Sequence, residues 1–358
     1  MTARPTALLT AALRDAGAFA PGRYPHWEEL IRYARESNLL GTLAWRLAAH
    51  GHLDAVPAAP RAHLIAARVL YTAQQCAVER EVREIARALR STGVQVVVLK
   101  GAAYLLAELP AAFGRLFSDI DILVPKKALP EVESSLMQAG FVTTHHHAYD
   151  QRYYREWMHE LPPMQHVKRM TVLDVHHTIV PCTSRIRLDV AALFGAAAPL
   201  AKWPGFRILA PADMVLHSAT HLFHNEDMTH GLRDLTDLDA LLNHFARDAK
   251  FWDTLTTRAD ELDLRRPLHY ALRWTARTLG TPVPDRVAAA SERHSGGPVV
   301  SRVMDHLLEH ALRPTANRAS TRWARRALYV RGHWLKMPMP MLAWHLTVKT
   351  FRREEQPA

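Results

Sequence analysis

The chain of 358 residues has few of the residues that would point to an oxidising compartment or a membrane. Its two cysteines, Cys76 and Cys182, are too few for a disulfide framework and exclude a site built from CxxC pairs. We expect both to be buried as small apolar residues. No apolar run approaches the roughly 18 residues that a spanning helix needs, and Arg14 and Asp15 interrupt the apolar patch near the N-terminus. We therefore expect a soluble, cytoplasmic protein.

Acidic residues are also in short supply. Asp and Glu number 35 against 45 Lys and Arg, so the formal net charge is +10. Such an excess favours an anionic partner, which could be nucleic acid, a nucleotide or an acidic membrane surface. Composition does not choose among them, because a high arginine content also produces basic enzymes that have no nucleic-acid role. The hydrophobic share of 48% is ordinary for a globular protein with a buried core.

Helical patterns flank a segment of short, β-branched apolar runs. Apolar residues recur at helical spacing over 27–50 and 62–89, and helical spacing returns after residue 181. We predict an α+β fold with a small mixed-sheet core at 91–181. An N-terminal helical lobe (1–90) and a C-terminal helical lobe with a basic tail (182–358) would flank this core and make a cleft.

The most informative stretch runs from residue 94 to residue 124. Residues 94–99 and 120–124 read as buried strands, joined by a Lys-Gly turn and a helix-length apolar segment. Because strand side chains alternate between faces, Asp119 and Asp121 point the same way. Two carboxylates so close repel one another unless a cation or a shared proton lies between them. Mg²⁺ binds through one or two carboxylates plus substrate phosphates, so the stretch predicts a metal-nucleotide site.

A third carboxylate, Asp174, lies within the apolar strand predicted over 171–176. A lone buried carboxylate is costly unless a cation accompanies it. Two aspartates on one strand and a third on a neighbouring strand can hold two Mg²⁺ ions. One ion would bind a triphosphate, and the other would lower the pKa of an acceptor hydroxyl.

The order of strand, Lys-Gly, helix, strand with Asp-x-Asp and later strand Asp resembles the DNA polymerase beta-type nucleotidyltransferase superfamily. More narrowly, the chain resembles the bacterial family of uncharacterised nucleotidyltransferases in the block 115–124 and in the stretches LKGAAYLL, HELPPMQH, LDVHHTIVPCTSR and HSATHLFH…LRDLTDLDALL. The resemblance covers most of the chain and is most specific in its middle third. It implies a sheet of nucleotidyltransferase type and Mg²⁺- or Mn²⁺-dependent transfer of an NMP from an NTP to an acceptor hydroxyl, with release of pyrophosphate.

The resemblance also implies residue roles. Asp119 and Asp121 would be ligands of both metals, and Asp174 would be the third ligand and a candidate base for the acceptor. The backbone of Gly101 would face the phosphates at a helix N-terminus. The superfamily usually has a second Gly or Ser where this chain has Ala102, so other residues must contact the phosphates. The candidates are Lys100, Arg115 and Ser118, although ion pairs would explain the first two equally well and a strand cap the third.

Several histidines fall within the same segment. His176 points to the same strand face as Asp174, and we predict it beside the metal site. The aromatic, basic and Pro-interrupted residues 150–168 predict a hairpin or loop over the site, from which His159 and His166 would line the acceptor pocket. A zinc site among these histidines is an alternative that would need a tetrahedral ligand set.

His217, His221 and His224 recur on one face of a predicted helix, and Asp237 lies on the next helix. A di-metal phosphohydrolase site is conceivable there. A His/Asp network that packs the helical lobe against the core is the commoner outcome. We keep His221 and Asp237 as candidates for the cleft.

Basic residues with interleaved tryptophans dominate the chain from Arg313 onward. They suit contact with the RNA backbone and stacking on bases, and they equally suit a solvated helix that buries its tryptophans. The acceptor is therefore left open among RNA, a protein side chain and a metabolite. The competing hypothesis is a non-catalytic nucleotide- or RNA-binding module that retains the fold.

Overall fold

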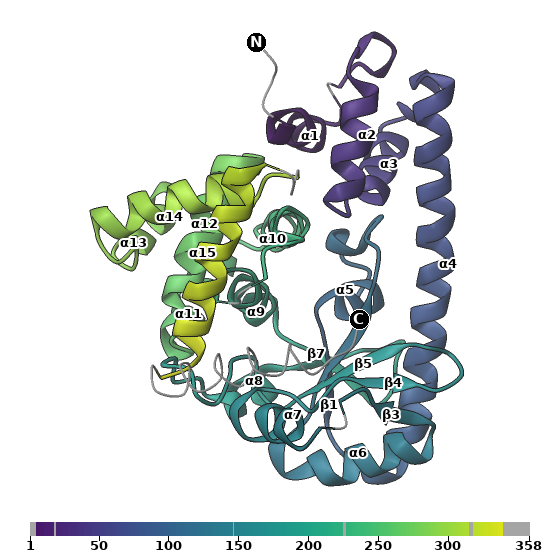
Figure 1. Ribbon diagram of the computed structural model, residues 1–358, viewed down its shortest axis with the longest axis vertical. Coiled ribbons are helices and arrows are strands. Elements are labelled where there is room, and N and C mark those ends of the chain that lie inside the picture. The colour runs from purple at the N-terminus through teal and green to yellow at the C-terminus, as the bar shows by residue number, and fades with distance from the viewer. Residues whose placement is uncertain (1–4, 18, 146, 225–226, 315–317, 339–358) are drawn as a thin grey trace.

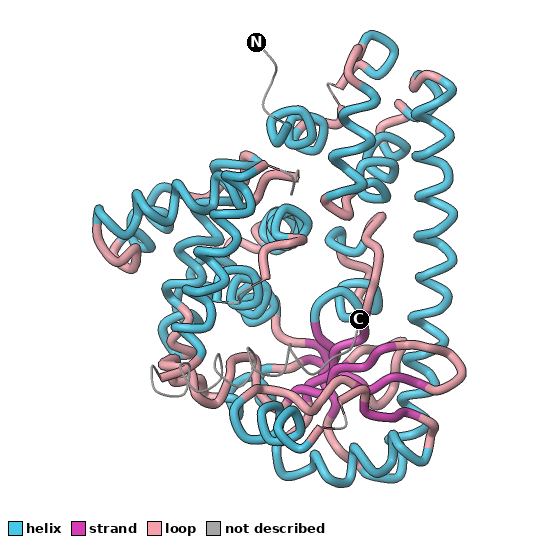
Figure 2. Tube along the Cα trace, in the orientation of Figure 1, coloured by secondary structure: helices cyan, strands magenta, loops and turns pink. Residues whose placement is uncertain are grey.

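The computed structural model describes residues 5–17, 19–145, 147–224, 227–314 and 318–338. These residues form an α+β protein in which helices flank a mixed sheet of seven strands, as predicted (Figure 1). Figure 2 shows the strands gathered in one region while helices make up most of the remaining chain.

The sheet has the strand order β3-β4-β5-β2-β1-β7-β6. At its centre, β1 pairs antiparallel with β2, and β2 pairs parallel with β5. This arrangement joins the two predicted strands of residues 94–124 to the later strand that carries Asp174. The strands are β1 (Val96–Leu99), β2 (Asp119–Leu123), β3 (Phe141–Thr143), β4 (Met164–His166), β5 (Val172–His176), β6 (Ala198–Pro199) and β7 (Phe206–Ile208).

One long helix connects the N-terminal helices to the sheet. It is α4 (Ala58–Leu89), which contacts α3 near one end and α6 near the other (Figure 1). The helical pattern over 27–50 forms two helices because Asn38 adopts a left-handed conformation with φ 59°, which asparagine tolerates better than most residues. The helices of this half are α1 (Pro5–Arg14), α2 (Trp27–Glu36), α3 (Leu40–Ala49), α5 (Lys100–Leu106) and α6 (Leu129–Gln138).

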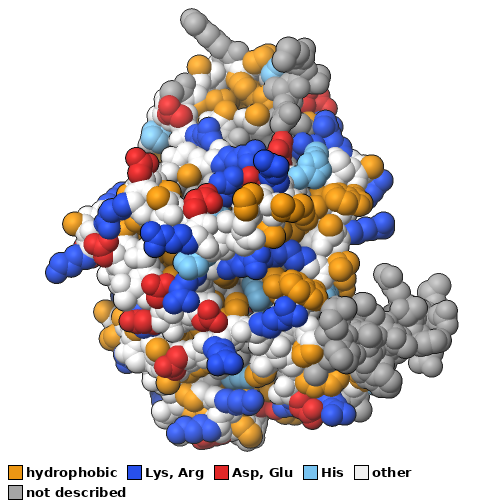
Figure 3. All heavy atoms as spheres, turned by 90° about the vertical axis from the view of Figure 1, so that its left-hand side faces the viewer, with side chains coloured by type: hydrophobic (Ala, Val, Ile, Leu, Met, Phe, Trp, Pro, Cys, Tyr) orange, Lys and Arg blue, Asp and Glu red, His pale blue; other side chains and the backbone are white. Residues whose placement is uncertain are grey.

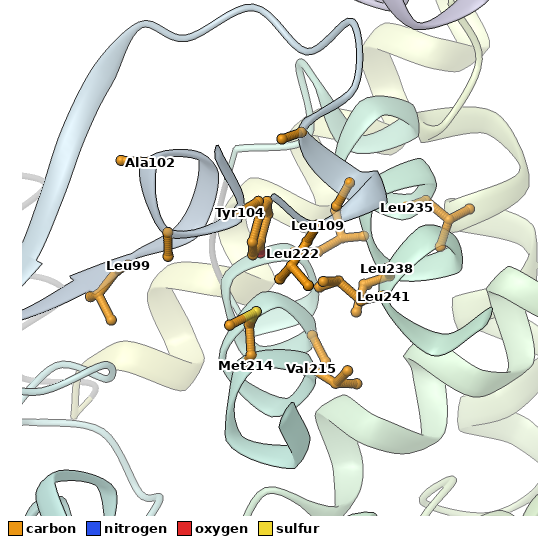
Figure 4. Packing of buried hydrophobic residues seen from close by; sticks show 14 of the residues in the cluster. Leu99, Ala102, Tyr104, Leu109, Met214, Val215, Leu222, Leu235, Leu238 and Leu241 are labelled. Atoms are coloured by element: carbon orange, nitrogen blue, oxygen red, sulfur yellow. The ribbon is translucent and has the colours of Figure 1, made fainter. Parts of the chain in front are cut away.

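The C-terminal helices pack against the core through α9 and α10. Figure 4 shows Tyr104 of α5 and the nearby Leu109 directed toward Leu222 of α9. All three side chains are buried, so the sheet side and the helical lobe share one hydrophobic core. The helices are α8 (Val190–Ala196), α9 (Pro211–His224), α10 (Gly231–Phe245), α11 (Phe251–Glu261), α12 (Arg265–Leu279), α13 (Asp285–Glu292), α14 (Pro298–Ala311) and α15 (Ala319–Lys336).

Two segments differ from the prediction. Residues 150–168 were predicted as a hairpin or loop, but only residues 158–163 and the turn after β4 are irregular. The segment continues α7 (Ala148–Arg152) into a π-helical turn (Tyr153–Trp157), along which the rings of Tyr153 and Trp157 pack, and then supplies β4. Beyond residue 181, the hairpin β6–β7 adds two strands to the sheet in a segment where only helices were predicted. These strands of two and three residues are too short to show a period in the sequence.

Both cysteines are exposed, so the expectation that they are buried is wrong. Cys76 lies on the outer face of α4, where the helix buries only the side that carries residues such as Tyr71, Val78 and Val82. Across the described ranges, no helix has the length and apolar character needed to cross a membrane.

Candidate active site

The three aspartates lie on neighbouring strands. Asp121 of β2 is directly opposite Asp174 of the parallel strand β5, and Asp119 lies two residues earlier on the same strand. Asp121 is buried, whereas Asp119 and Asp174 retain partial exposure. The sheet therefore holds three carboxylates together at one place, as the strand alternation indicated.

Asp121 is held by two basic groups. Lys100 Nζ donates to Asp121 Oδ1 over 2.7 Å, and His176 Nε2 lies 2.9 Å from the same oxygen. Burial alone would raise the pKa of Asp121, but Lys100 and His176 hold it well below its usual range. Lys100 has a left-handed backbone with φ 46°, a strain of about 1–2 kcal/mol that the surrounding structure must offset. The Lys-Gly turn thus supplies an ammonium group to the carboxylates.

Asp174 differs from Asp121, because its pKa is raised and not lowered. Its Oδ1 is buried and has no hydrogen-bond partner in the described part of the chain. Burial, then the nearby charges of Asp121 and Glu160, raise the pKa of Asp174 to about 7. A cation placed between these carboxylates would remove the repulsion and favour the ionised form.

Glu160 is a site residue that the sequence reasoning missed. Its Oε2 lies 3.2 Å from His176 Nδ1 and 3.8 Å from His159 Nε2, and the rings of the two histidines stack with centroids 5.2 Å apart. An isolated bridge between Glu160 and His176 positions this segment. The HELPPMQH stretch did contain the glutamate, but an irregular segment has no period that could show where its side chain points.

His159, Glu160 and His176 could together hold a metal ion. One possible ligand atom from each lies within 4.8 Å of the others, and they are the one such group of three found among the described residues. Burial, then His176, lower the pKa of His159 well below its usual value, so its ring is neutral as metal binding requires. The aspartates do not form so tight a group. His176 connects the two sets because it contacts both Asp121 and Glu160.

Two histidines of α9 face the same network. His217 is buried and His221 nearly so, and burial followed by the charge of Lys100 lowers the pKa of each. Both rings are therefore neutral and add polar groups without positive charge. The sequence retains His221 as a cleft candidate, whereas it leaves His217 open between a di-metal site and a packing network.

Arg115 and Asp237 form a buried ion pair with one another. Arg115 Nε donates to Asp237 Oδ2 over 2.8 Å, and both side chains are buried. This ion pair connects the segment before β2 to α10. Both residues were candidates for the site: Arg115 for a phosphate contact and Asp237 for the cleft. A di-metal phosphohydrolase site on α9 and α10 is also not formed, because Asp237 is committed to Arg115 and no such group of ligands occurs in the described chain.

Gly101 leaves room for that arginine. A Cβ at residue 101 would lie 2.2 Å from Arg115 Nη1. The absence of a side chain therefore serves the buried ion pair, next to the lysine that holds Asp121.

We expect Gly101→Ala to destabilise the protein by about 1–3 kcal/mol, because the new methyl group must push the Arg115 guanidinium away from Asp237. Gly195→Ala is the matched control. Gly195 lies in α8 with open space around it, so alanine should be neutral or stabilise by about 0.5–1 kcal/mol. Urea unfolding of the two variants measures the difference, and equal stabilities would contradict this role of Gly101.

Ser118 and His166 have local partners. Ser118 Oγ donates to Asp119 Oδ1 over 2.9 Å, so it orients a predicted metal ligand. His166 Nδ1 accepts the backbone N–H groups of Lys168 and Arg169 over 3.1 and 3.2 Å, and its ring packs edge-on against Phe141. His166 therefore stabilises the turn after β4, and the structure does not bring it to the carboxylates.

A cavity of 190 Å³ opens beside Asp119, between α4 and the start of β2. Arg80 and Arg169 are its basic lining residues, and Arg169 is already paired with the buried Glu81 through two bonds of 2.6 Å. The cavity provides space next to the carboxylates on the side of the sheet that α4 covers.

Part of the basic C-terminal segment is structural. Arg325 donates to the carbonyl groups of Ala311 and Arg313 at the end of α14, and Arg331 donates to the carbonyl of Phe223. Trp323 and Trp334 remain 58% and 40% exposed, so they are not buried as a purely structural helix would require. Lys349, Arg352, Arg353 and Trp344 lie outside the described residues.

The sequence profile of a family described as "Uncharacterised nucleotidyltransferase" matches residues 24–280. This range contains the whole sheet and all the predicted site residues. No curated protein and no solved structure matches the chain. Because the family match covers well over half of the chain, the protein belongs to the family of uncharacterised nucleotidyltransferases.

Proposed function

We propose that the protein transfers an NMP from an NTP to an acceptor hydroxyl, with a divalent cation held by Asp119, Asp121 and Asp174. The observation that carries this proposal is the pairing of Asp121 with Asp174 on adjacent parallel strands. Family membership supports nucleotidyl transfer in general and a nucleotide as substrate. The cation, the residue roles and the acceptor belong to the proposal.

The carboxylates fit Mg²⁺ or Mn²⁺ by their chemistry. Oxygen ligands are the donors that these hard ions prefer, and the buried Oδ1 of Asp174 has no hydrogen-bond partner among the described residues. When bound, the metal would neutralise phosphate charge and lower the pKa of the acceptor hydroxyl. The close group of His159, Glu160 and His176 is a second place where the same chain could hold a cation.

In the proposed reaction, the acceptor oxygen attacks the α-phosphorus of the NTP. The new bond joins that oxygen to phosphorus, and the bond from phosphorus to the oxygen bridging to the β-phosphate breaks. Pyrophosphate leaves with the bridging oxygen. Asp174 would receive the hydroxyl proton as the general base, since a carboxylate beside the acceptor oxygen can take up a proton in the transition state.

The experiment supplies each of the four NTPs, labelled at the α-phosphate, with Mg²⁺ or Mn²⁺ and with total RNA or cell extract as the source of acceptor. The expected result is label transfer and pyrophosphate release that require the cation and vanish in an Asp119→Asn/Asp121→Asn variant. Label transfer that persists in this variant or in excess EDTA would contradict the proposal.

A non-catalytic nucleotide- or RNA-binding module is the second candidate, and one contact favours it. The ammonium group of Lys100, 2.7 Å from Asp121, already supplies a positive charge where a metal-binding carboxylate would otherwise need one. Ala102 also stands where the superfamily usually has Gly or Ser. NTP binding without pyrophosphate release for any nucleotide and acceptor source would support this candidate.

The raised pKa of Asp174 makes a stability prediction that is independent of activity. Its folded pKa of about 7 lies above the value of about 3.9 for an unfolded chain, so stability falls as the pH rises from about 4 to 7. Asp174→Asn removes this pH-dependent loss of folding stability. Without divalent ions, we expect the variant to gain stability relative to wild type on going from pH 5 to pH 8, by about 1 kcal/mol or more.

Thermal unfolding at both pH values checks this expectation. Glu131→Gln, at an exposed glutamate of α6, is the matched control and should show no such trend. Added Mg²⁺ should raise the melting temperature of the wild type at pH 8 more than that of Asp174→Asn, because the ligand is missing in the variant. A difference that does not change with pH would show that Asp174 is ionised at little cost.

A further inference from the structure

A second cavity lies in the helical lobe. It has a volume of 330 Å³ and is bounded by the end of α9, the start of α12, the last turns of α15 and residues 185–186. None of the functions proposed above uses it.

The cavity is strongly basic. Four arginines line it, with Asp263 as its one acidic lining residue. Arg265 lies 3.8 Å from Asp263 and also pairs with Asp260, which leaves the arginines in excess. Figure 3 shows Lys and Arg side chains, with hydrophobic ones between them, over the face formed by the C-terminal helices. The other three arginines of the cavity are Arg185, Arg266 and Arg331.

Two of these arginines are placed at a cost that an anion would offset. Burial lowers the pKa of Arg331, and the positive charge of Arg266 lowers it further. Arg266 is the second residue of α12, a helix that has no acidic residue in its first turn and no side-chain cap. Cations are unfavourable at a helix N-terminus, where free amide groups favour negative charge. Tyr270, in the cavity wall, offsets part of the effect on Arg331, because its side chain interacts with the Arg331 guanidinium.

Part of the remaining wall is apolar and aromatic. Phe223, Pro267 and Leu335 contribute to it, and the guanidinium of Arg185 stacks on the ring of Trp334 at 4.4 Å. Such surfaces bind planar rings. A volume of 330 Å³ is at the small end of the range for ligand pockets, so it suits a compact ligand with a ring and an anionic group.

Two elements connect this cavity to the carboxylate site. On α9, His221 faces the Lys100 network and His224, three residues later, lines the cavity, a rise of about 4.5 Å. At the end of α15, the charge of Lys336 acts on His159 while Trp334 and Leu335 line the cavity. The same two helices, α9 and α15, therefore carry residues that act on the carboxylate network and residues that line the cavity.

We propose that this cavity binds the acceptor of nucleotidyl transfer, and that the acceptor is a small, ring-bearing phosphate monoester with a free hydroxyl. The arginines and the start of α12 would bind its phosphate, and the Trp334 surface would bind its ring. This inference rests on the proposed function, because that function makes the bound ligand an acceptor. The binding site itself does not depend on that function.

The first test measures binding by calorimetry in EDTA, which removes metal-dependent binding at the carboxylates. The probe is phenyl phosphate, with inorganic phosphate and phenol as its two halves. We expect saturable 1:1 binding of phenyl phosphate that is tighter than that of either half and at least about tenfold weaker in Arg266→Gln. Arg302→Gln, an exposed arginine of α14 outside the cavity, should bind like the wild type. No saturable binding, or equal affinities in the two variants, would overturn the proposal.

The second test identifies the acceptor. The small-molecule fraction of a cell extract is treated with immobilised alkaline phosphatase, which is removed before the α-labelled NTP is added, and a mock-treated fraction is the control. We expect label transfer only with the mock-treated fraction, with a higher KM for acceptor in Arg266→Gln. Transfer that survives phosphatase treatment, or transfer into RNA alone, would overturn the acceptor assignment and leave the transferase function standing. No transfer with any fraction, together with Arg266-dependent binding of phenyl phosphate, would support the anion site and refute the proposed function.

Discussion

Replacing Asp121 by asparagine should reduce nucleotidyl transfer by about a thousandfold or more. A bound metal is worth several kcal/mol of transition-state stabilisation, and about 1.4 kcal/mol corresponds to a factor of ten in rate. Asparagine keeps the size of the side chain and an oxygen that can accept hydrogen bonds from Lys100 and His176. The expected loss therefore arises from the missing charge, and steady-state rates of label transfer measure it.

The same substitution leaves the ammonium of Lys100 without its 2.7 Å partner, so the single variant should also be less stable. Lys100→Met/Asp121→Asn separates the two effects, because it removes both charges. This double variant should regain stability and remain inactive. Glu131→Gln, which removes an exposed carboxylate elsewhere, should keep full activity. Activity within about tenfold of wild type in Asp121→Asn would exclude Asp121 as a metal ligand.

Replacing Arg115 by methionine should destabilise the protein by about 3–5 kcal/mol, because it leaves the charge of Asp237 buried and unpaired. The two side chains are only 10% and 8% exposed, so water cannot replace the lost partner. Urea unfolding measures the effect. The matched control is Arg155→Met, which breaks the ion pair with Glu133 at the surface and should cost about 1 kcal/mol or less.

A double variant decides whether the charge or the packing is responsible. Arg115→Met/Asp237→Leu replaces the buried pair by apolar side chains of similar volume and should recover most of the lost stability. A double variant as unstable as Arg115→Met would show that the shape of the guanidinium matters more than its charge. In that case, the close fit between Arg115 and Gly101 would be the main reason for the arginine.

The parts of the fold that sequence predicted are those with a clear local period. The helix predicted over 62–89 is confirmed as α4, because apolar residues recur along it at helical spacing. The strand alternation likewise put Asp119 and Asp121 on one face, and the apolar run around Asp174 identified β5. These signals need only a few consecutive residues.

The parts that sequence did not predict depend on contacts between distant segments. Glu160 reaches His176 from an irregular segment, and His217 faces Lys100 from a helix more than a hundred residues later. The sequence left Arg115 open between a phosphate contact and an ion pair, because its partner, Asp237, is 122 residues away. No local pattern distinguishes a basic side chain that binds a substrate from one that forms an ion pair with a distant carboxylate.

The strand β7 has a consequence for how the protein must be made. It pairs parallel with β1, whose four residues are all buried, and it comes from residues 206–208. A fragment that stops at residue 181 would leave the backbone groups of β1 unpaired along one apolar edge, a surface that recruits other chains. Residues 206–208 must therefore be synthesised before β1, the strand that leads into Lys100, can pair along both of its edges. A chain truncated before residue 206 is expected to aggregate through this edge.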